Sequence, residues 1–184
     1  FSPDVTPIVP QKGDRGNVTP KLLTEAVRSL AINLRMMGAD SPIQSLVISS
    51  AMPGDGKSTV ALHLAQAAAA MGQRVLLVDA DLRRPQIHHR FSLFNGQGLV
   101  NLITQSDTPV QEMIQPSGLE ERLWILTSGQ RPPDPSRLLS SETMKRLNQS
   151  LCEAFDLVIY DTPPLLGLSD ASVLSRSEEH TSEL

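Results

Sequence analysis

The chain has 184 residues, 40% of them hydrophobic, and a formal net charge of −4 at pH 7. This length suits one α/β domain with a sizeable core and is short for two. The charge balance lacks the basic footprint of a nucleic-acid-binding protein, the single Cys152 excludes a disulfide framework, and no apolar run approaches the roughly 18 residues of a membrane span.

The two ends of the chain differ in composition from its middle. Residues 1–18 contain three prolines and little apolar content, which is typical of a flexible linker. Residues 176–184, with the sequence RSEEHTSEL, resemble the in-frame translation of a common sequencing adapter, and we interpret them as a non-native tail. We therefore predict one domain over residues 19–175 and expect it to be incomplete at its C-terminus.

The first regular element is predicted over residues 19–37. Thr19 suits an N-cap and Pro20 the first helical position, while Gly38 and Pro42 are placed to end the helix. Between them the apolar residues recur every three or four positions, at Leu23, Ala26, Val27, Leu30, Leu34 and Met37. This spacing predicts an amphipathic helix of about 19 residues with a solvated polar face.

A glycine-bearing turn at residues 49–59 follows the apolar run 46–48 and precedes an alanine-rich helical pattern at 60–71. The apolar run has the composition of a buried strand, so the predicted order is strand, turn and helix. In this context a Gly-Lys-Ser sequence forms a phosphate-binding loop. Ala51 stands where the usual motif has its first glycine.

The residues of this turn match the chemistry of a triphosphate. Gly54 and Gly56 allow backbone N–H groups to turn toward the β-phosphate, and the helix N-terminus adds positive potential. Lys57 can reach the β- and γ-oxygens, and Ser58 can ligate Mg²⁺. The sequence therefore predicts a site for a nucleoside triphosphate with Mg²⁺.

The next predicted strand, at residues 74–78, is almost wholly apolar, as expected of a central parallel strand covered on both faces. Asp79 and Asp81 follow it, at the edge where α/β sheets bind ligands. If strand geometry persists, alternation points both carboxylates to similar sides, which indicates a metal-binding or catalytic role. Arg83 and Arg84 come next, and either phosphate binding or pairing with these acids fits their position.

The signal weakens in the second half of the chain. Short helices are predicted at 87–91, 98–103 and 110–114, followed by a strand at 123–127 and a helix from 136 to about 153. The short helices are joined by turn sequences such as Asn-Gly and Asp-Thr-Pro. We expect them to be surface elements.

The last predicted strand, at residues 157–161, is apolar and again ends in an acid, Asp161. An aspartate after a buried strand can hold a water in the Mg²⁺ shell, as nucleotide hydrolases and kinases require. Its position about a hundred residues after the P-loop is typical of a Walker B motif. Tyr160 lies inside this strand, and we interpret it as a core residue.

Taken together, the motifs resemble those of one family, the bacterial tyrosine kinases that control polymerisation and export of capsular or extracellular polysaccharide. Residues 50–59 (SAMPGDGKST) look like that family's P-loop, and residues 75–85 (VLLVDADLRRP) look like its second Walker A-type motif. The resemblance covers about residues 21–175. It implies an ATP-dependent protein-tyrosine kinase with an α/β P-loop NTPase fold, in which helices flank a mainly parallel central sheet.

The resemblance also implies a role for each motif residue. The nucleotide is expected to bind at Pro53, Gly54, Asp55, Gly56, Lys57, Ser58 and Thr59. The implied catalytic residues are Lys57, Asp79 and Asp81, and the implied metal-binding residues are Ser58, Asp79 and Asp161. ATP and Mg²⁺ are the implied cofactors. Asp79 is the favoured base for the tyrosine hydroxyl, and Asp81 stays open as the alternative.

Partners and location follow from the same resemblance. The family forms homo-oligomers through a segment that residues 25–34 resemble, but here Ala31 and Ile32 replace an arginine and a threonine of that segment. The second implied partner is a membrane activator or co-polymerase domain, and no nucleic acid is expected. The implied location is cytoplasmic, at the inner face of the plasma membrane, reached through an upstream membrane domain or a partner. The acceptor tyrosines are expected in a tail beyond Ser175.

Two other functions stay open on the sequence alone. A partitioning or division-site ATPase of the same superfamily would use its nucleotide cycle to switch dimerisation, but such ATPases carry a lysine where this chain has Met52. A non-catalytic domain that binds ATP and regulates a polysaccharide co-polymerase is the other alternative. The complete set of basic, hydroxyl and acidic motif residues counts against an inactive domain.

Overall fold

The computed structural model describes residues 20–37, 42–105 and 108–165. The predicted linker at 1–18 and the predicted non-native tail at 176–184 lie outside the described residues. Within the described ranges the chain forms a five-stranded sheet in the order β1-β5-β2-β4-β3. No helix in these ranges is both long enough and apolar enough to cross a membrane.

The sheet is mainly parallel, which confirms the fold expected from the sequence. The parallel strands are β1 (Ser45–Ile48), β5 (Leu157–Asp161), β2 (Val75–Asp79) and β4 (Leu123–Leu126), and β3 (Ile114–Pro116) pairs antiparallel with β4. β2 and β5 are buried along their whole length, which explains their continuous apolar runs. β3 was not predicted, because a strand of three residues is too short to show an alternation of apolar and polar side chains. Its proline is tolerated because the strand lies at an edge.

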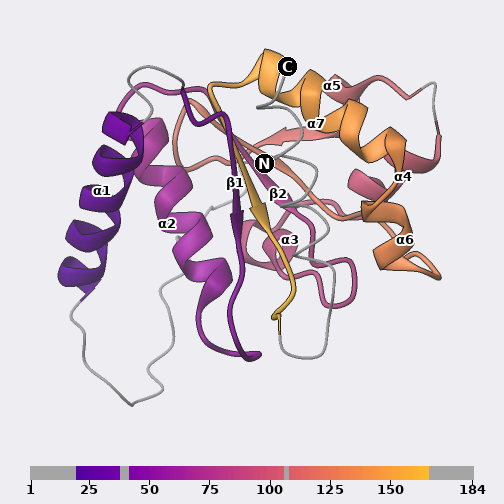
Figure 1. Ribbon diagram of the computed structural model, residues 1–184, viewed down its shortest axis with the longest axis horizontal. Helices are drawn as coiled ribbons and strands as arrows, with labels where there is room; N and C mark the ends of the chain where they lie inside the picture. The colour runs from indigo at the N-terminus through magenta and orange to yellow at the C-terminus, as the bar shows by residue number, and fades with distance from the viewer. Residues whose placement is uncertain (1–19, 38–41, 106–107, 166–184) are drawn as a thin grey trace, which may run out of the picture.

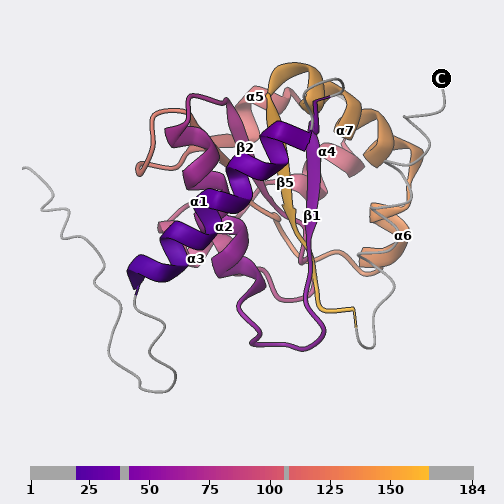
Figure 2. The ribbon, with the colours of Figure 1, turned by 60° about the vertical axis from the view of Figure 1, so that its left-hand side comes forward.

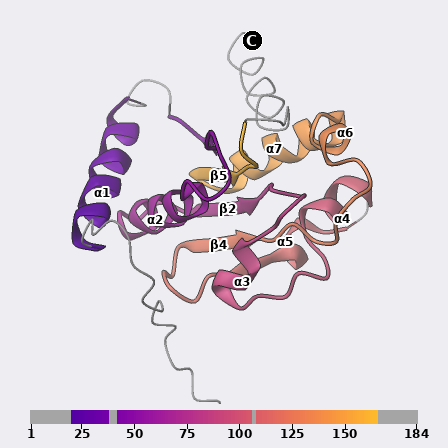
Figure 3. The ribbon, with the colours of Figure 1, turned by 90° about the horizontal axis from the view of Figure 1, so that it is seen from below.

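Helices cover both faces of the sheet (Figures 1 and 3). One face carries α1 (Pro20–Met37), α2 (Lys57–Ala70) and α3 (Ile87–Phe91). The other face carries α4 (Leu99–Thr104), α5 (Val110–Met113), α6 (Pro135–Leu139) and α7 (Glu142–Ala154). α1 packs against α2, as Figure 2 shows, so the first helix forms an outer layer. The domain is therefore a layered α/β structure.

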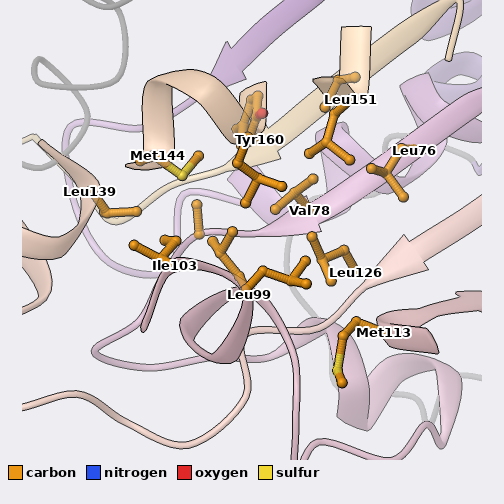
Figure 4. Close-up of a cluster of buried hydrophobic side chains, with 14 of the residues drawn as sticks. Leu76, Val78, Leu99, Ile103, Met113, Leu126, Leu139, Met144, Leu151 and Tyr160 are labelled. Atoms are coloured by element: carbon orange, nitrogen blue, oxygen red, sulfur yellow. The ribbon is translucent and has the colours of Figure 1, made fainter. Parts of the chain in front are cut away.

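Alternation along the strands divides the apolar side chains between two cores. Leu76, Val78, Leu126 and Tyr160 lie in the core beneath α4 to α7 (Figure 4). Tyr160 is 1% exposed and its hydroxyl donates to Asn148 Oδ1 at 2.6 Å, which confirms its predicted core position. The opposite core is formed with the alanine-rich face of α2, whose small side chains let the helix lie close to the sheet.

The single helix predicted from 136 to about 153 is wrong, because the chain forms α6 and α7 instead. Ser141 lies between them in an extended conformation, and its hydroxyl accepts a hydrogen bond from Met144 N–H at 3.2 Å. Asp134 caps α6 in the same way, accepting from Arg137 N–H at 3.1 Å. Side-chain-to-backbone hydrogen bonds of this kind can interrupt a helix, and the spacing of apolar residues, on which the prediction was based, gives no sign of them.

Candidate active site

The P-loop connects β1 to α2 at the carboxyl edge of the sheet, at the bottom of Figure 1. Gly54 and Gly56 have φ angles of +92° and +90°, in the left-handed region that glycine adopts readily. Met52 N–H donates to Asp55 Oδ2 at 2.8 Å, which closes the turn that contains Gly54. α2 begins at Lys57, so the free N–H groups of its first turn and its positive dipole end face the loop.

The Lys57 side chain contacts three polar side chains of the site. Its Nζ lies 3.1 Å from Asp161 Oδ1, 3.2 Å from Asp81 Oδ2 and 3.2 Å from Ser58 Oγ. The lysine side chain is 12% exposed, so these contacts are sheltered from solvent. The ammonium group is therefore held between the ends of β2 and β5 and the P-loop.

Asp161 ends β5 and is paired in register with Ile48 of β1 and Asp79 of β2. Burial raises the pKa of the Asp161 carboxyl, while the charge of Lys57 and hydrogen bonds from Ser58 and Lys57 lower it. Its Oδ2 is buried with no hydrogen-bond partner among the described residues. The structure thus brings Asp161, Ser58 and Lys57 together.

Asp79 and Asp81 have different surroundings. Asp79 is fully buried, and its Oδ2 accepts from Gln86 N–H at 3.0 Å and Ile87 N–H at 2.9 Å, at the start of α3. The pKa of Asp79 is raised to about 7, because burial and, to a smaller extent, the charges of Asp161 and Asp81 raise it more than the two backbone N–H groups lower it. Its Oδ1 is buried without a partner in the described part of the chain.

Asp81 faces the P-loop instead. Its Oδ2 pairs with Lys57, and its Oδ1 accepts from Arg84 N–H at 3.0 Å. β2 ends at Asp79, so the alternation that would point both carboxylates to similar sides does not continue to Asp81. Asp81 lines the pocket described below, and Asp79 does not.

A pocket of about 720 Å³ opens above the P-loop. It is lined by Pro53, Gly54, Gly56, Lys57, Ser58, Thr59, Asp81, Arg83, Arg84, Gln86, Arg90, Arg131, Pro163 and Pro164. Of the predicted nucleotide-binding residues, Asp55 alone is not part of this lining. Five of the lining side chains are cationic and one is a carboxylate, which favours a polyanionic ligand such as a triphosphate.

All four arginines of this lining occupy positions that the sequence left open, at Arg83 and Arg84, or missed, at Arg90 and Arg131. Arg83 donates to Ser136 Oγ at 3.2 Å, and Arg90 donates to Thr59 Oγ1 at 3.1 Å. Arg131 reaches the pocket from the loop that follows β4. Its place at the carboxyl end of a parallel strand was a signal that could have identified it. Arg90 gave no such signal, because its position depends on how α3 packs.

Comparison with known proteins supports the P-loop interpretation. A family model described as an AAA domain matches residues 43–180. Tyrosine-protein kinase YwqD of Bacillus subtilis (strain 168) is 44% identical over 156 residues, which are 84% of this chain and 65% of that protein. Tyrosine-protein kinase etk of Escherichia coli (strain K12) is 39% identical over 153 residues, which are 83% of this chain and 21% of that protein. The chain thus spans about two thirds of the first relative and about a fifth of the second.

Solved structures agree with these relatives. The kinase domain of Escherichia coli tyrosine kinase ETK has a TM-score of 0.78 at 39% identity, covering 84% of this chain and 60% of that one. The septum site-determining protein MinD of Pyrococcus horikoshii, complexed with Mg-ADP, is more distant, with 24% identity, a TM-score of 0.60 and coverage of 73% and 54%. At that identity the likeness shows the fold alone, so the division-site alternative has much weaker support.

Proposed function

The chain belongs to the bacterial tyrosine-kinase family, and we propose that it transfers the γ-phosphoryl group of ATP to tyrosine hydroxyls of protein. One observation carries this proposal: the Lys57 ammonium lies between Asp81 and Asp161, beside the Ser58 hydroxyl and at the base of a cationic pocket. Phosphoryl transfer needs positioned positive charge and a carboxylate near the attacking oxygen.

Each residue has a proposed task. Lys57 neutralises charge on the β- and γ-phosphoryl oxygens, and its two carboxylate partners fix the direction of its ammonium group. Backbone N–H groups from Gly54 to Ser58 bind the phosphate chain, and Thr59 lies next to them in the first turn of α2. The N–H groups are fixed before the reaction by the closed turn, so little reorganisation is needed.

Mg²⁺ fits the pair formed by Ser58 and Asp161. The hydroxyl donates to Asp161, and the buried Oδ2 of that aspartate has no hydrogen-bond partner among the described residues. When bound, Mg²⁺ would neutralise charge on the transferring phosphoryl group. The described residues contain no cluster of three or more His, Cys, Asp or Glu arranged for a metal. Mg²⁺ is commonly held by one or two protein oxygens together with substrate phosphates and water.

Asp79 and Asp81 each have one of the two properties that a general base needs, a suitable pKa and access to the substrate. Asp79 has a pKa of about 7, which suits proton transfer at neutral pH, but it is fully buried against α3. Asp81 lines the pocket and is 5% exposed, but it already pairs with Lys57. We propose that Asp81 accepts the proton of the acceptor hydroxyl and that Asp79 holds the loop beneath it through its hydrogen bonds from Gln86 and Ile87 N–H.

A substitution at Lys57 tests the proposed function. The measurement is transfer of labelled γ-phosphate to a set of tyrosine-bearing peptides with ATP and Mg²⁺. Lys57→Met should lower transfer by about a hundredfold or more, whereas Lys145→Met, which removes an exposed lysine of α7, should leave it unchanged. ATP hydrolysis without transfer by the unaltered chain would favour the division-site type of ATPase. Binding without either reaction would favour the non-catalytic domain.

Partners and location are part of the same proposal. We propose that copies of this chain act on one another, that a membrane activator or co-polymerase domain engages the domain at the inner face of the plasma membrane, and that capsular or extracellular polysaccharide synthesis is the regulated process. In the segment resembling the family's oligomer motif, Ala31 is 4% exposed and packs toward α2, while Ile32 is 42% exposed. The replacement at position 31 therefore lies inside the domain.

A further inference from the structure

The five cationic side chains of the pocket come from different parts of the fold. Lys57 lies in the first turn of α2, and Arg90 donates to Thr59 in that same turn. Arg84 and Arg131 come instead from the loops after β2 and β4. Both are exposed, and neither side chain has a hydrogen bond or ion pair with any described residue.

The strand order places these two arginines on one side of the site. The sheet runs β1-β5-β2-β4-β3, and the P-loop follows β1. Along the carboxyl edge, away from the P-loop, the order is Asp161 at the end of β5, then Asp81 and Arg84 after β2, then Arg131 after β4. Arg131 thus lies beyond the carboxylates along this edge, and Arg84 lies beside Asp81 in the loop after β2.

We expect an acceptor to approach from the side of these two arginines, because the phosphates occupy the side of the P-loop. The γ-phosphoryl group is expected at Lys57, and the attacking hydroxyl must reach a carboxylate next to it. Asp81 is the carboxylate that lines the pocket, and the main chain of Arg84 lies beside it, because the Arg84 backbone N–H donates to Asp81 Oδ1. The chain that carries the acceptor hydroxyl therefore passes over two unpaired guanidinium groups.

We infer that Arg84 and Arg131 bind carboxylate side chains that flank the acceptor tyrosine, so that the substrate is an acidic protein segment. This inference rests on the proposed kinase function. Arginine forms bidentate, charge-assisted hydrogen bonds with carboxylates, so two arginines from separate loops select both the charge and the position of flanking Asp or Glu residues. A contact between an exposed arginine and a carboxylate changes affinity by about two- to fivefold.

The test uses three peptides that share one tyrosine and differ only in its neighbours, which are Glu, Gln or Lys. With the unaltered chain, kcat/KM should be highest for the Glu peptide and lowest for the Lys peptide, mainly through KM. Arg84→Gln and Arg131→Gln should each reduce the preference for Glu over Gln by about two- to fivefold. The double reversal Arg84→Glu with Arg131→Glu should favour the Lys peptide. Arg146→Gln, which alters an exposed arginine of α7 outside the pocket, is the matched control.

Binding of a fluorescent ATP analogue to the same variants separates acceptor recognition from nucleotide binding. An equal rate with the Glu and Gln peptides, or a loss of nucleotide affinity that matches the loss of activity, would overturn the inference. In either case the kinase function would stand. If the unaltered chain phosphorylates none of the three peptides, the proposed function itself fails, and the inference falls with it. Raising the salt concentration should reduce the preference for Glu, because exposed charges are screened.

Discussion

Asp79→Asn should make this domain more stable at neutral pH but not in acid. The carboxyl is fully buried, and burial raises its pKa from 3.8 to about 7. A pKa that is higher in the folded state than in the unfolded state contributes stability below the unfolded value, and that stability is lost as the pH rises through the folded value. For Asp79 the loss should occur between about pH 4 and pH 7.

The size of the effect follows from the pKa difference. The rise in the pKa from 3.8 to about 7, at about 1.36 kcal/mol per pH unit, corresponds to on the order of 4 kcal/mol of unfolding free energy. Asparagine cannot ionise, and its side-chain oxygen can still accept from Gln86 and Ile87 N–H. The stability of the variant relative to the unaltered chain should therefore increase by about 4 kcal/mol between acid and neutral pH.

Urea unfolding followed by circular dichroism at a series of pH values, with nucleotide and Mg²⁺ left out, measures this difference. Asp134→Asn is the matched control, because that aspartate is exposed and asparagine also caps helices. This variant measures how much of the pH profile comes from removing one exposed carboxylate. Parallel pH profiles for Asp79→Asn and the unaltered chain would refute the reasoning, since they would mean that Asp79 ionises as easily in the folded state as in the unfolded state.

Three further predictions concern other parts of the fold and site. Gly98→Ala should lower the unfolding free energy by about 1–3 kcal/mol in a thermal melt, because the new Cβ would overlap Thr127 O and lie 2.6 Å from Gly129 N. Gly96→Ala should lower the unfolding free energy less, because its methyl group meets only the exposed ring of Phe94. Ser141→Ala should lower the unfolding free energy by about 1 kcal/mol, because it removes the N-cap of α7, whereas Ser150→Ala within that helix should not. Equal urea midpoints for these two variants would contradict this. Asp161→Asn should raise the Mg²⁺ concentration for half-maximal phosphoryl transfer by about tenfold or more, with Asp134→Asn unchanged; an unaltered Mg²⁺ requirement would remove Asp161 from the metal site.

The P-loop and its surroundings were predictable because their signals are local. Two glycines, a lysine and a serine at fixed spacing, and the change from a strand pattern to a helical pattern all lie within about twenty residues. The structure places Lys57 and Ser58 accordingly at the start of α2. Asp161 was predictable for a related reason, since an acid at the carboxyl end of a buried parallel strand must lie on the same sheet edge as the P-loop.

The separation of Asp79 from Asp81 was not predictable in this way. Both follow one strand, and strand alternation would give them similar directions. Only in the folded chain does β2 end at Asp79, so that its carboxylate meets the N–H groups of α3 while Asp81 meets Lys57. The break between α6 and α7 is similar, because a serine cap decides it and the apolar spacing continues across it.

The sequence by itself determined the layered α/β fold, the phosphate-binding loop and the acids that end β2 and β5, because these depend on periodicity, turn chemistry and residue order along one stretch of chain. Only the tertiary structure decided which cations surround the pocket and which carboxylate faces it. Arg90 and Arg131 are separated from the P-loop by tens of residues, and strand order and helix packing bring them to it. Those long-range arrangements result from burying two apolar faces of one sheet, which no local pattern in the sequence encodes.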